Sequence, residues 1–182
     1  MKQTREGRVK PSDYLTGPLA IYLANKCHCS YFVRCYHNQD DPNFPIGETL
    51  PFIDSEYLRV LTNFIKNHQE YLIIDLHGCR NSRKCDCSIW SDDAKLCDNH
   101  LLDIFQNQLE KHSLSVDRGS EFLGGQVTRQ CGILTNAFQL EVKKRIRSIK
   151  KENYSWLEAF TTSIEQAIID SNNYYTAYQK KK

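Results

Sequence analysis

The sequence predicts a single α/β domain, spanning residues 1–182, with a mainly parallel or mixed sheet flanked by helices. Segments with helical spacing of apolar residues alternate along the chain with short, strand-like apolar runs. The runs at 71–78 and 136–142 are nearly continuous, as in strands that are covered on both faces. The chain has 182 residues, of which 40% are hydrophobic, enough for one sizeable core. No internal repeat or linker divides it.

The charge balance excludes some partners. With 24 basic and 22 acidic residues the net charge is +2, which gives no general attraction to nucleic acid or to membranes. No run approaches the roughly 18–20 apolar residues of a membrane span. Residues 1–10 are polar and lack the apolar centre of a signal peptide. We therefore expect a cytoplasmic protein, in which the eight cysteines are thiols or metal ligands rather than disulfides.

The first half of the chain predicts two helices and two strands. Residues 16–27 have the spacing of a packed helix, with Pro18 tolerated in its first turn. Residues 29–36 are rich in aromatic and β-branched residues, which favours a buried strand, and a Pro-rich loop follows. Asp54 or Ser55 can cap the next helix, which leads to the strand at 71–78. The apolar stripe of that helix consists of Tyr57, Leu58, Leu61, Phe64 and Ile65.

The second half begins with a polar, cysteine-bearing insert. We expect residues 80–93 to be a surface excursion with reactive thiols. A helix over 98–112, a short strand at 114–116, a glycine-containing loop and a core strand at 136–142 follow. The basic run 143–151 is expected to form a solvated helix face. The last helix is expected to begin at Ser155 and to fray at 179–182. The inward residues of the helix at 98–112 are expected to be Leu101, Leu102, Phe105 and Leu109.

Two polar residues end the core strands. His77 closes the run "YLIIDLH", and Glu141 is the last polar position of "NAFQLEV". Ligands of open α/β sheets bind beyond the carboxyl ends of the strands, so both side chains should lie at one edge, with Gly124 and Gly125 lining the same cleft. A buried carboxylate needs a partner. For Glu141 the sequence leaves open a metal, another cation, a catalytic water or an ion pair with a nearby lysine or arginine.

Three segments together carry a family resemblance. "DLHG" at 75–78, "FLGGQVTRQCG" at 122–132 and "NAFQLEV" at 136–142 resemble, in order and spacing, the N-formylglutamate amidohydrolase family. The resemblance extends over residues 11–147. It implies the fold of zinc carboxypeptidases and aspartoacylases, with His77 as a zinc ligand and Glu141 as the general acid and base. It also implies zinc-dependent hydrolysis of a small acidic N-acyl amino acid, since zinc lowers the pKa of bound water to about 7.

The resemblance extends to substrate-binding residues. Arg34 would stabilise the oxyanion formed at the amide carbonyl. Arg129 would grip a substrate carboxylate, which its planar fork can bind with two hydrogen bonds. Asn43 matches the asparagine of an Asn-Arg pair that binds substrate in the family, with Phe44 in place of the arginine. Gly124 and Gly125 would line the substrate cleft. Each arginine also suits a surface ion pair.

One departure bears on the metal. The family's first metal motif supplies two of three protein ligands, and residues 1–15 contain no histidine. Zinc held by His77 alone would be weak, so we expect zinc to be weakly bound or absent. We also expect no appreciable amidase activity on N-formyl or N-acetyl amino acids, with or without added zinc. Strong zinc-dependent turnover would instead mean that other residues, with His37 and Asp75 the nearest candidates, complete the site.

Two alternatives from other classes stay open. One is a non-catalytic domain that holds a small anion with Arg34, Arg129 and Asn43. The other is a cysteine-ligated structural zinc module that binds a macromolecule, although the cysteine spacings lack paired C-x2-C knuckles. Its ligand candidates are Cys79, Cys85, Cys87, Cys97 and His100, together with Cys27, Cys29, Cys35 and His37.

Overall fold

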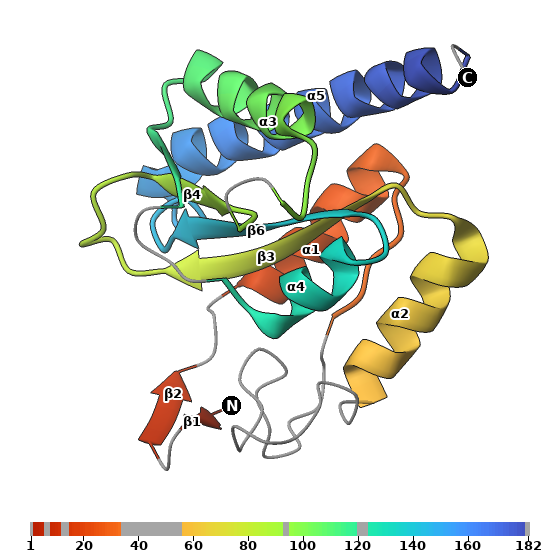
Figure 1. The fold of residues 1–182 in the computed structure, drawn as a ribbon. Coiled ribbons are helices and arrows are strands. Elements are labelled where there is room, and N and C mark those ends of the chain that lie inside the picture. Colours follow the sequence, from red (N-terminus) through yellow and green to blue (C-terminus); the bar gives the residue numbers. More distant parts are fainter. Residues whose placement is uncertain are drawn as a thin grey trace.

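A four-stranded mixed sheet with helices on both faces forms a single α/β domain (Figure 1). The computed structural model describes residues 2–5, 8–11, 15–33, 56–92, 95–119 and 124–180, with the backbone alone at 2–5 and 8–11. The predicted fold class is confirmed. The sheet order is β3 (Leu72–Cys79), β6 (Asn136–Lys143), β4 (Cys87–Trp90) and β5 (Val116–Arg118). β1 (Lys2–Arg5) and β2 (Arg8–Pro11) form a separate antiparallel pair.

Strand direction in the sheet is mixed because β4 runs antiparallel to β6. β3 and β6 run parallel over their full lengths, β6 and β4 run antiparallel, and β4 and β5 run parallel. β3 is thus an edge strand, and all eight of its residues are only partly buried. In β6, by contrast, every residue after the first is buried.

Two cores lie on opposite faces of the sheet. The larger contains Phe105, Phe138 and Phe160, with residues from α1, α3 and α5. The smaller joins α2 and α4 to Ala137 of β6 through Leu58, Leu61 and Val127, among others. The helices are α1 (Thr16–Cys27), α2 (Glu56–His68), α3 (Asn99–Lys111), α4 (Gln126–Gly132) and α5 (Tyr154–Gln179), with a 3-10 turn, η1 (Lys151–Asn153), before α5.

Most of the predicted helices are found where their apolar spacing placed them. α1 has the predicted bounds. α3 buries the four predicted residues, and its first turn is capped by Asp98, whose side chain accepts a hydrogen bond from the backbone N–H of His100 at 2.8 Å. α5 begins at Tyr154, one residue earlier than predicted, so Ser155 lies inside the first turn and does not cap it. No helix in the described part of the chain is both long enough and apolar enough to cross a bilayer.

The strand predicted at 29–36 is not formed over its described part. Residues 29–33 have no regular secondary structure, and 34–36 lie outside the described residues. α1 ends at Cys27, and the C-cap residue, His28, adopts a left-handed conformation with φ 55°. The N–H of Cys29 donates a hydrogen bond back to the carbonyl of Ala24. The aromatic residues here pack instead of pairing: the ring of Phe32 lies edge-on to Phe64 of α2, 4.9 Å between centroids.

The cysteine-bearing insert was wrongly predicted to be a surface excursion. Residues 80–84 are exposed, as expected, but the four residues of β4 are buried and pair with both β6 and β5. A strand of four residues is too short for its alternation to stand out in a polar segment. The strand predicted at 114–116 lies two residues further on, as β5.

The basic run 143–151 is not a helix face. Lys143 ends β6, a turn follows, and Lys143, Ile146 and Arg147 are buried. The Nε of Arg147 donates to the carbonyl of Val142 at 3.0 Å, and its guanidinium lies where a side chain at Gly78 would be. The side chains of Lys143 and Arg147 are therefore packed at the end of the sheet and do not form a solvated surface. α4, in turn, has no counterpart among the predicted elements.

Candidate functional site

The polar side chains of β3 and β6 lie in matching register. Asp75 is opposite Gln139, and His77 is opposite Glu141. Since alternate residues of a strand share a face, all four project from the same face of the sheet. Val127 and Cys131 of α4 pack in the core on this face. The prediction that His77 and Glu141 lie at the same edge is confirmed.

One chain of hydrogen bonds runs from α4 to His77. The buried hydroxyl of Thr128 donates to Oδ2 of Asp75 at 2.9 Å, and Oδ1 of Asp75 lies 3.0 Å from Nε2 of His77. The side chains of His77 and Asp75 are 15% and 12% exposed. An ionised carboxylate only accepts, so the proton of a neutral His77 ring is on Nε2 and Nδ1 keeps its lone pair. Histidines that bind metals commonly donate their other ring N–H to a carboxylate, as His77 does here.

A second chain of hydrogen bonds leads to Glu141. The backbone N–H of Gly125 donates to Oε1 of Gln139 at 2.7 Å, and Nε2 of Gln139 donates to Oε1 of Glu141 at 2.8 Å. Gln139 and Glu141 are both buried. The amide of Gln139 is fixed by its two partners, so the carboxylate of Glu141 is held in one orientation. Lys143, one of the cations considered for Glu141, is engaged elsewhere, 3.4 Å from Asp86.

Gly124 and Arg129 contact Trp90 at the corner of this face. Gly124 has φ 66°, and a Cβ there would overlap the Trp90 ring, so this position demands glycine. The guanidinium of Arg129 lies over the same ring, 4.7 Å from its centre, and its Nη1 is 3.9 Å from Asp92. The side chain of Arg129 is 41% exposed. Gly124, Gly125 and Arg129 are therefore gathered beside the Gln139–Glu141 chain, while Arg34 and Asn43 lie outside the described residues.

Sequence reasoning missed Thr128, Gln139 and Trp90. For Gln139 a signal was present, because "FQLEV" places Gln139 and Glu141 two residues apart, on one face of a strand. Asp75 and His77 have the same spacing. For Thr128 and Trp90 the sequence carries no such signal, because their positions depend on α4 and on how β4 enters the sheet.

The described residues do not complete a three-ligand metal site. Within the described ranges, no group of three His, Cys, Asp or Glu side chains is placed to hold a metal ion. His77 has the orientation and the backing carboxylate of a metal ligand, and Glu141 lies on the neighbouring strand. Asp75 is engaged with His77 and Thr128. Since a catalytic zinc uses three protein ligands, these residues stop short of one, and no chemical step is assigned to zinc.

Among the described residues, no group of three cysteine, histidine or acidic side chains forms the structural zinc site considered above, and Cys35 and His37 lie outside these residues. Burial raises the pKa of Cys97 to about 12 and that of Cys79 to about 11, and Cys87 is completely buried with a pKa raised well above its usual range. Zinc binds the thiolate form. Thiols with such pKa values stay protonated at neutral pH in the absence of a metal, as in buried cysteines that pack as small apolar residues.

The charges on this face also bear on the anion-binding alternative. Asp75 and Glu141 lie beside His77, and Asp117 of β5 accepts a hydrogen bond from Ser88 of β4 at 3.3 Å. The described site thus holds carboxylates that can accept protons, and an anion would need a cation beside them. Arg129, at its corner, is the cation that could meet a substrate carboxylate.

Comparison with solved structures finds the same fold in two amidases. One is an N-formylglutamate amidohydrolase from Ralstonia eutropha, with a TM-score of 0.55 and 17% identity, over 64% of this chain and 50% of that chain. The other is an N-acetylmuramoyl-L-alanine amidase from Clostridium difficile, with a TM-score of 0.54 and 12% identity, over 95% of this chain and 89% of that chain. No protein-family model and no curated protein matches the sequence.

These comparisons establish a fold of the amidase type. The chain spans half the length of the N-formylglutamate amidohydrolase that it resembles. Both neighbours are named as enzymes that cleave amides, and at identities below 20% the likeness is one of fold. The N-formylglutamate amidohydrolase is the neighbour whose family the motifs around His77, Gly124 and Glu141 resemble.

Proposed function

We propose that this protein binds a small acidic N-acyl amino acid at the carboxyl ends of β3 and β6, in an amide-hydrolase site whose proton-transfer group is Glu141. One observation carries the proposal: His77 and Glu141 are paired in register on neighbouring strands, and each is held by its own chain of hydrogen bonds. Buried polar side chains contribute less to stability than apolar ones unless all their hydrogen bonds are made. Four polar side chains side by side on these two strands therefore suggest a role in binding or catalysis rather than in packing.

The chemistry proposed for Glu141 is proton transfer. Its carboxylate takes a proton from a water molecule, whose oxygen attacks the carbonyl carbon of the amide. The C–N bond then breaks, and the same proton passes from Glu141 to the leaving nitrogen, which gives a carboxylic acid and an amine. His77, oriented by Asp75, would position the water or the carbonyl, and Arg129 would meet the substrate carboxylate. Because the described residues stop short of a zinc site, the proposal is tested on binding before turnover.

Binding is therefore the primary test. Trp90 lies at the site, and Trp156 on α5 lies beneath Arg145, 4.1 Å from its guanidinium. In a Trp156→Phe background the fluorescence of Trp90 reports on the site. N-formyl-L-glutamate is expected to change this fluorescence saturably, and L-glutamate without the acyl group to do so much more weakly. The absence of binding of any N-acyl amino acid would overturn the proposal.

Glu141→Gln tests the assignment of the carboxylate. This substitution removes a negative charge near an acidic ligand and keeps an acceptor for Gln139, so binding is expected to tighten by about threefold to tenfold. Glu158→Gln, on the exposed surface of α5, is the matched control and should leave binding unchanged. Turnover that Glu141→Gln abolishes would also support the role of Glu141. Binding that is equal in both variants would contradict it.

A further inference from the structure

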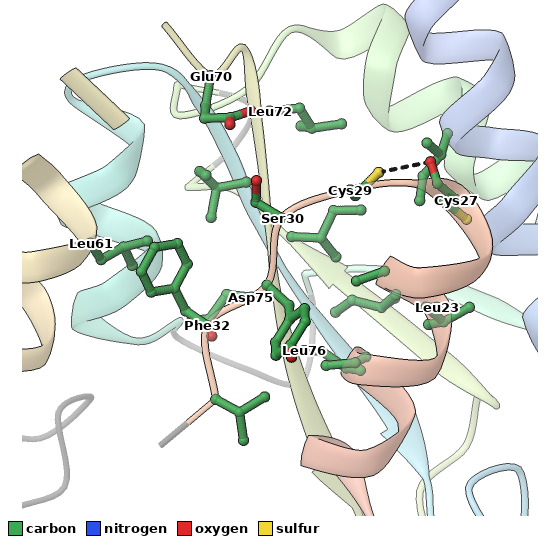
Figure 2. A pocket seen from close by; sticks show the side chains of 18 of the residues that line it. Leu23, Cys27, Cys29, Ser30, Phe32, Leu61, Glu70, Leu72, Asp75 and Leu76 are labelled. Atoms are coloured by element: carbon green, nitrogen blue, oxygen red, sulfur yellow. Dashed lines mark hydrogen bonds between the residues drawn. The ribbon is translucent and has the colours of Figure 1, made fainter. Parts of the chain in front are cut away.

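A large cavity adjoins the candidate site along the outer edge of β3. Its volume is about 600 Å³, which is within the range of pockets that hold drug-sized ligands. Figure 2 shows its side chains gathered around the segment that follows α1: Leu23 on α1, Phe32 on the segment, Leu61 on α2, and Leu72 and Leu76 on β3. A formyl group would fill only a small part of such a space.

The cavity reaches the candidate site through β3 itself. Ile73, Asp75 and His77 all line it, and as alternate residues of one strand they share the face on which Glu141 lies. Asp75 and His77 form its polar end near the site. Ile73 belongs to the apolar remainder, where it packs with the core between α2 and α4. A ligand whose amide lies at His77 and Glu141 therefore has apolar space beside its carbonyl.

Apolar side chains form somewhat more than half of the walls. They come from α1, α2, α5 and β3, and include Leu23, Leu61, Phe64, Leu72, Ile74 and Ile168, beside polar groups such as Ser30, Glu70 and Asn172. β3 is flanked by packed elements on both faces, yet each of its eight residues is only partly buried. The cavity therefore lies against an edge strand whose side chains are still partly accessible. An apolar group that enters would remove this surface from water.

The geometry points to a specificity for N-acyl amino acids whose acyl group is a medium-length hydrocarbon chain, which lies in the cavity along β3 with its amide at His77 and Glu141. This inference rests on the proposed function and names its substrate class. A hydrocarbon chain fits better than an added peptide strand, since residues 29–33 already run beside β3 at the cavity and a chain needs no backbone hydrogen bonds. The amino-acid part stays at the polar face, within reach of Arg129.

The test is a series of N-acyl-L-glutamates with formyl, acetyl, butanoyl, hexanoyl and octanoyl groups, measured by calorimetry. Burial of one methylene favours binding by about fourfold, so the dissociation constant should fall by about threefold to fourfold per added methylene until the cavity is full. Affinity that is flat or falls with chain length, in a protein that binds N-formyl-L-glutamate, would overturn the acyl pocket and leave the proposed function standing.

A pair of substitutions checks the location. Ile73→Phe narrows the cavity from β3, and Ile169→Phe makes the same change at an exposed position of α5. Ile73→Phe should raise the dissociation constants of the hexanoyl and octanoyl ligands by at least tenfold. N-formyl-L-glutamate should bind as before, which also shows that the variant is folded. Ile169→Phe should keep the full series. Equal loss in both variants, or in neither, would overturn the placement.

Free octanoate separates the two proposals. It offers the hydrocarbon chain without the amino acid, so it should bind the wild type weakly and Ile73→Phe more weakly still. Octanoate binding without binding of any N-acyl amino acid would keep the apolar cavity and refute the proposed function. If neither octanoate nor a long-chain N-acyl-glutamate binds, the acyl pocket is refuted.

Discussion

Thr128 and Asp75 are joined by a hydrogen bond of 2.9 Å although 53 positions of sequence separate them. The bond ties α4 to the polar end of β3 and leaves the other oxygen of Asp75 to His77, at 3.0 Å. Thr128 is fully buried. The orientation of His77 therefore depends on α4 through Asp75.

Thr128→Val should expose this dependence. Valine has the shape of threonine but cannot donate, so Oδ2 of Asp75 loses a buried partner, which costs about 1–3 kcal/mol of unfolding free energy. Thr128→Ser keeps the donor and loses one methyl group, at a cost of about 1 kcal/mol. Urea denaturation at pH 7 measures both. Equal destabilisation by valine and serine would show that the hydroxyl does not hold Asp75.

The glycine before α4 offers a second prediction. Gly124→Ala must adopt a positive φ and also displace the ring of Trp90. Gly119 also has a positive φ, 78°, but a Cβ there would lie 3.5 Å from Trp90, an ordinary contact. Gly119→Ala should therefore cost about 1–2 kcal/mol, for the backbone alone. Gly124→Ala should cost about 1–3 kcal/mol more, because of the overlap.

Both glycine variants are read by thermal unfolding, with the fluorescence of Trp90 as a local signal. A matching loss of stability in the two variants would mean that Trp90 moves aside freely and that the Gly124 corner is not fixed by packing.

The third prediction concerns acid stability. Asp86 is buried and is contacted by Arg145 at 2.6 Å and by the hydroxyl of Ser115 at 2.9 Å. Burial by itself would raise the pKa of the Asp86 carboxyl, but the hydrogen bonds from Ser115 and Arg145 outweigh it and hold the pKa below its usual value. A carboxyl with a lowered folded-state pKa contributes stability above its unfolded pKa of about 3.9. That stability is lost as the pH falls through the lower folded-state pKa.

Asp86→Asn should accordingly destabilise the protein by about 3–5 kcal/mol at pH 7, because it leaves buried cations without their anion. The difference from the wild type should shrink as the pH falls below about 4. Asp103→Asn is the matched control: Asp103 pairs with Arg118 at the surface, where its side chain is 58% exposed, and should change stability by less than about 1 kcal/mol. A difference from the wild type that does not change with pH would contradict the titration of Asp86.

The fourth prediction replaces the expected reactivity of the cysteine insert. Cys29 is exposed, whereas Cys87, Cys97 and Cys131 are buried, and burial raises the pKa of Cys97 and Cys131 to about 12. Only the thiolate reacts with disulfide reagents. The pKa of the Cys29 thiol is also raised by partial burial, but its exposure should let it react in the native protein, whereas the three buried thiols should react only after unfolding. Cys29→Ser, against Cys97→Ser, assigns the fast phase in a colorimetric thiol assay.

Amphipathic spacing made much of this fold predictable from the sequence. The apolar spacing of α1 and α3 predicts these two helices, and a long apolar run bounded by polar residues predicts β6. β4 could not be predicted, because a strand of four residues in a polar segment becomes a strand only through its two neighbours. The prediction for residues 29–33 was wrong in the opposite direction. Their composition favours a strand, but they form no strand and instead pack on α2 through Phe32.

The candidate site divides in the same way. His77 and Glu141 were predictable as polar ends of apolar strands, and the register of β3 with β6 unites them. Thr128 and Trp90 were not, because their contacts depend on tertiary structure that no local pattern encodes. The roles of Arg129 and of the glycine pair stay predictions, which the binding experiments above address.

The packing of Arg147 against Gly78 has an evolutionary consequence. Any side chain at position 78 would collide with the guanidinium, and that guanidinium also donates a hydrogen bond to the carbonyl of Val142. A larger residue in place of the glycine of "DLHG" would therefore push the buried guanidinium away from this hydrogen bond, and the two positions should tend to change together among descendants of a common ancestor. A homologue with alanine or serine at position 78 is expected to carry a shorter residue at position 147, and Gly78→Ala should cost less stability when Arg147 is shortened in the same molecule.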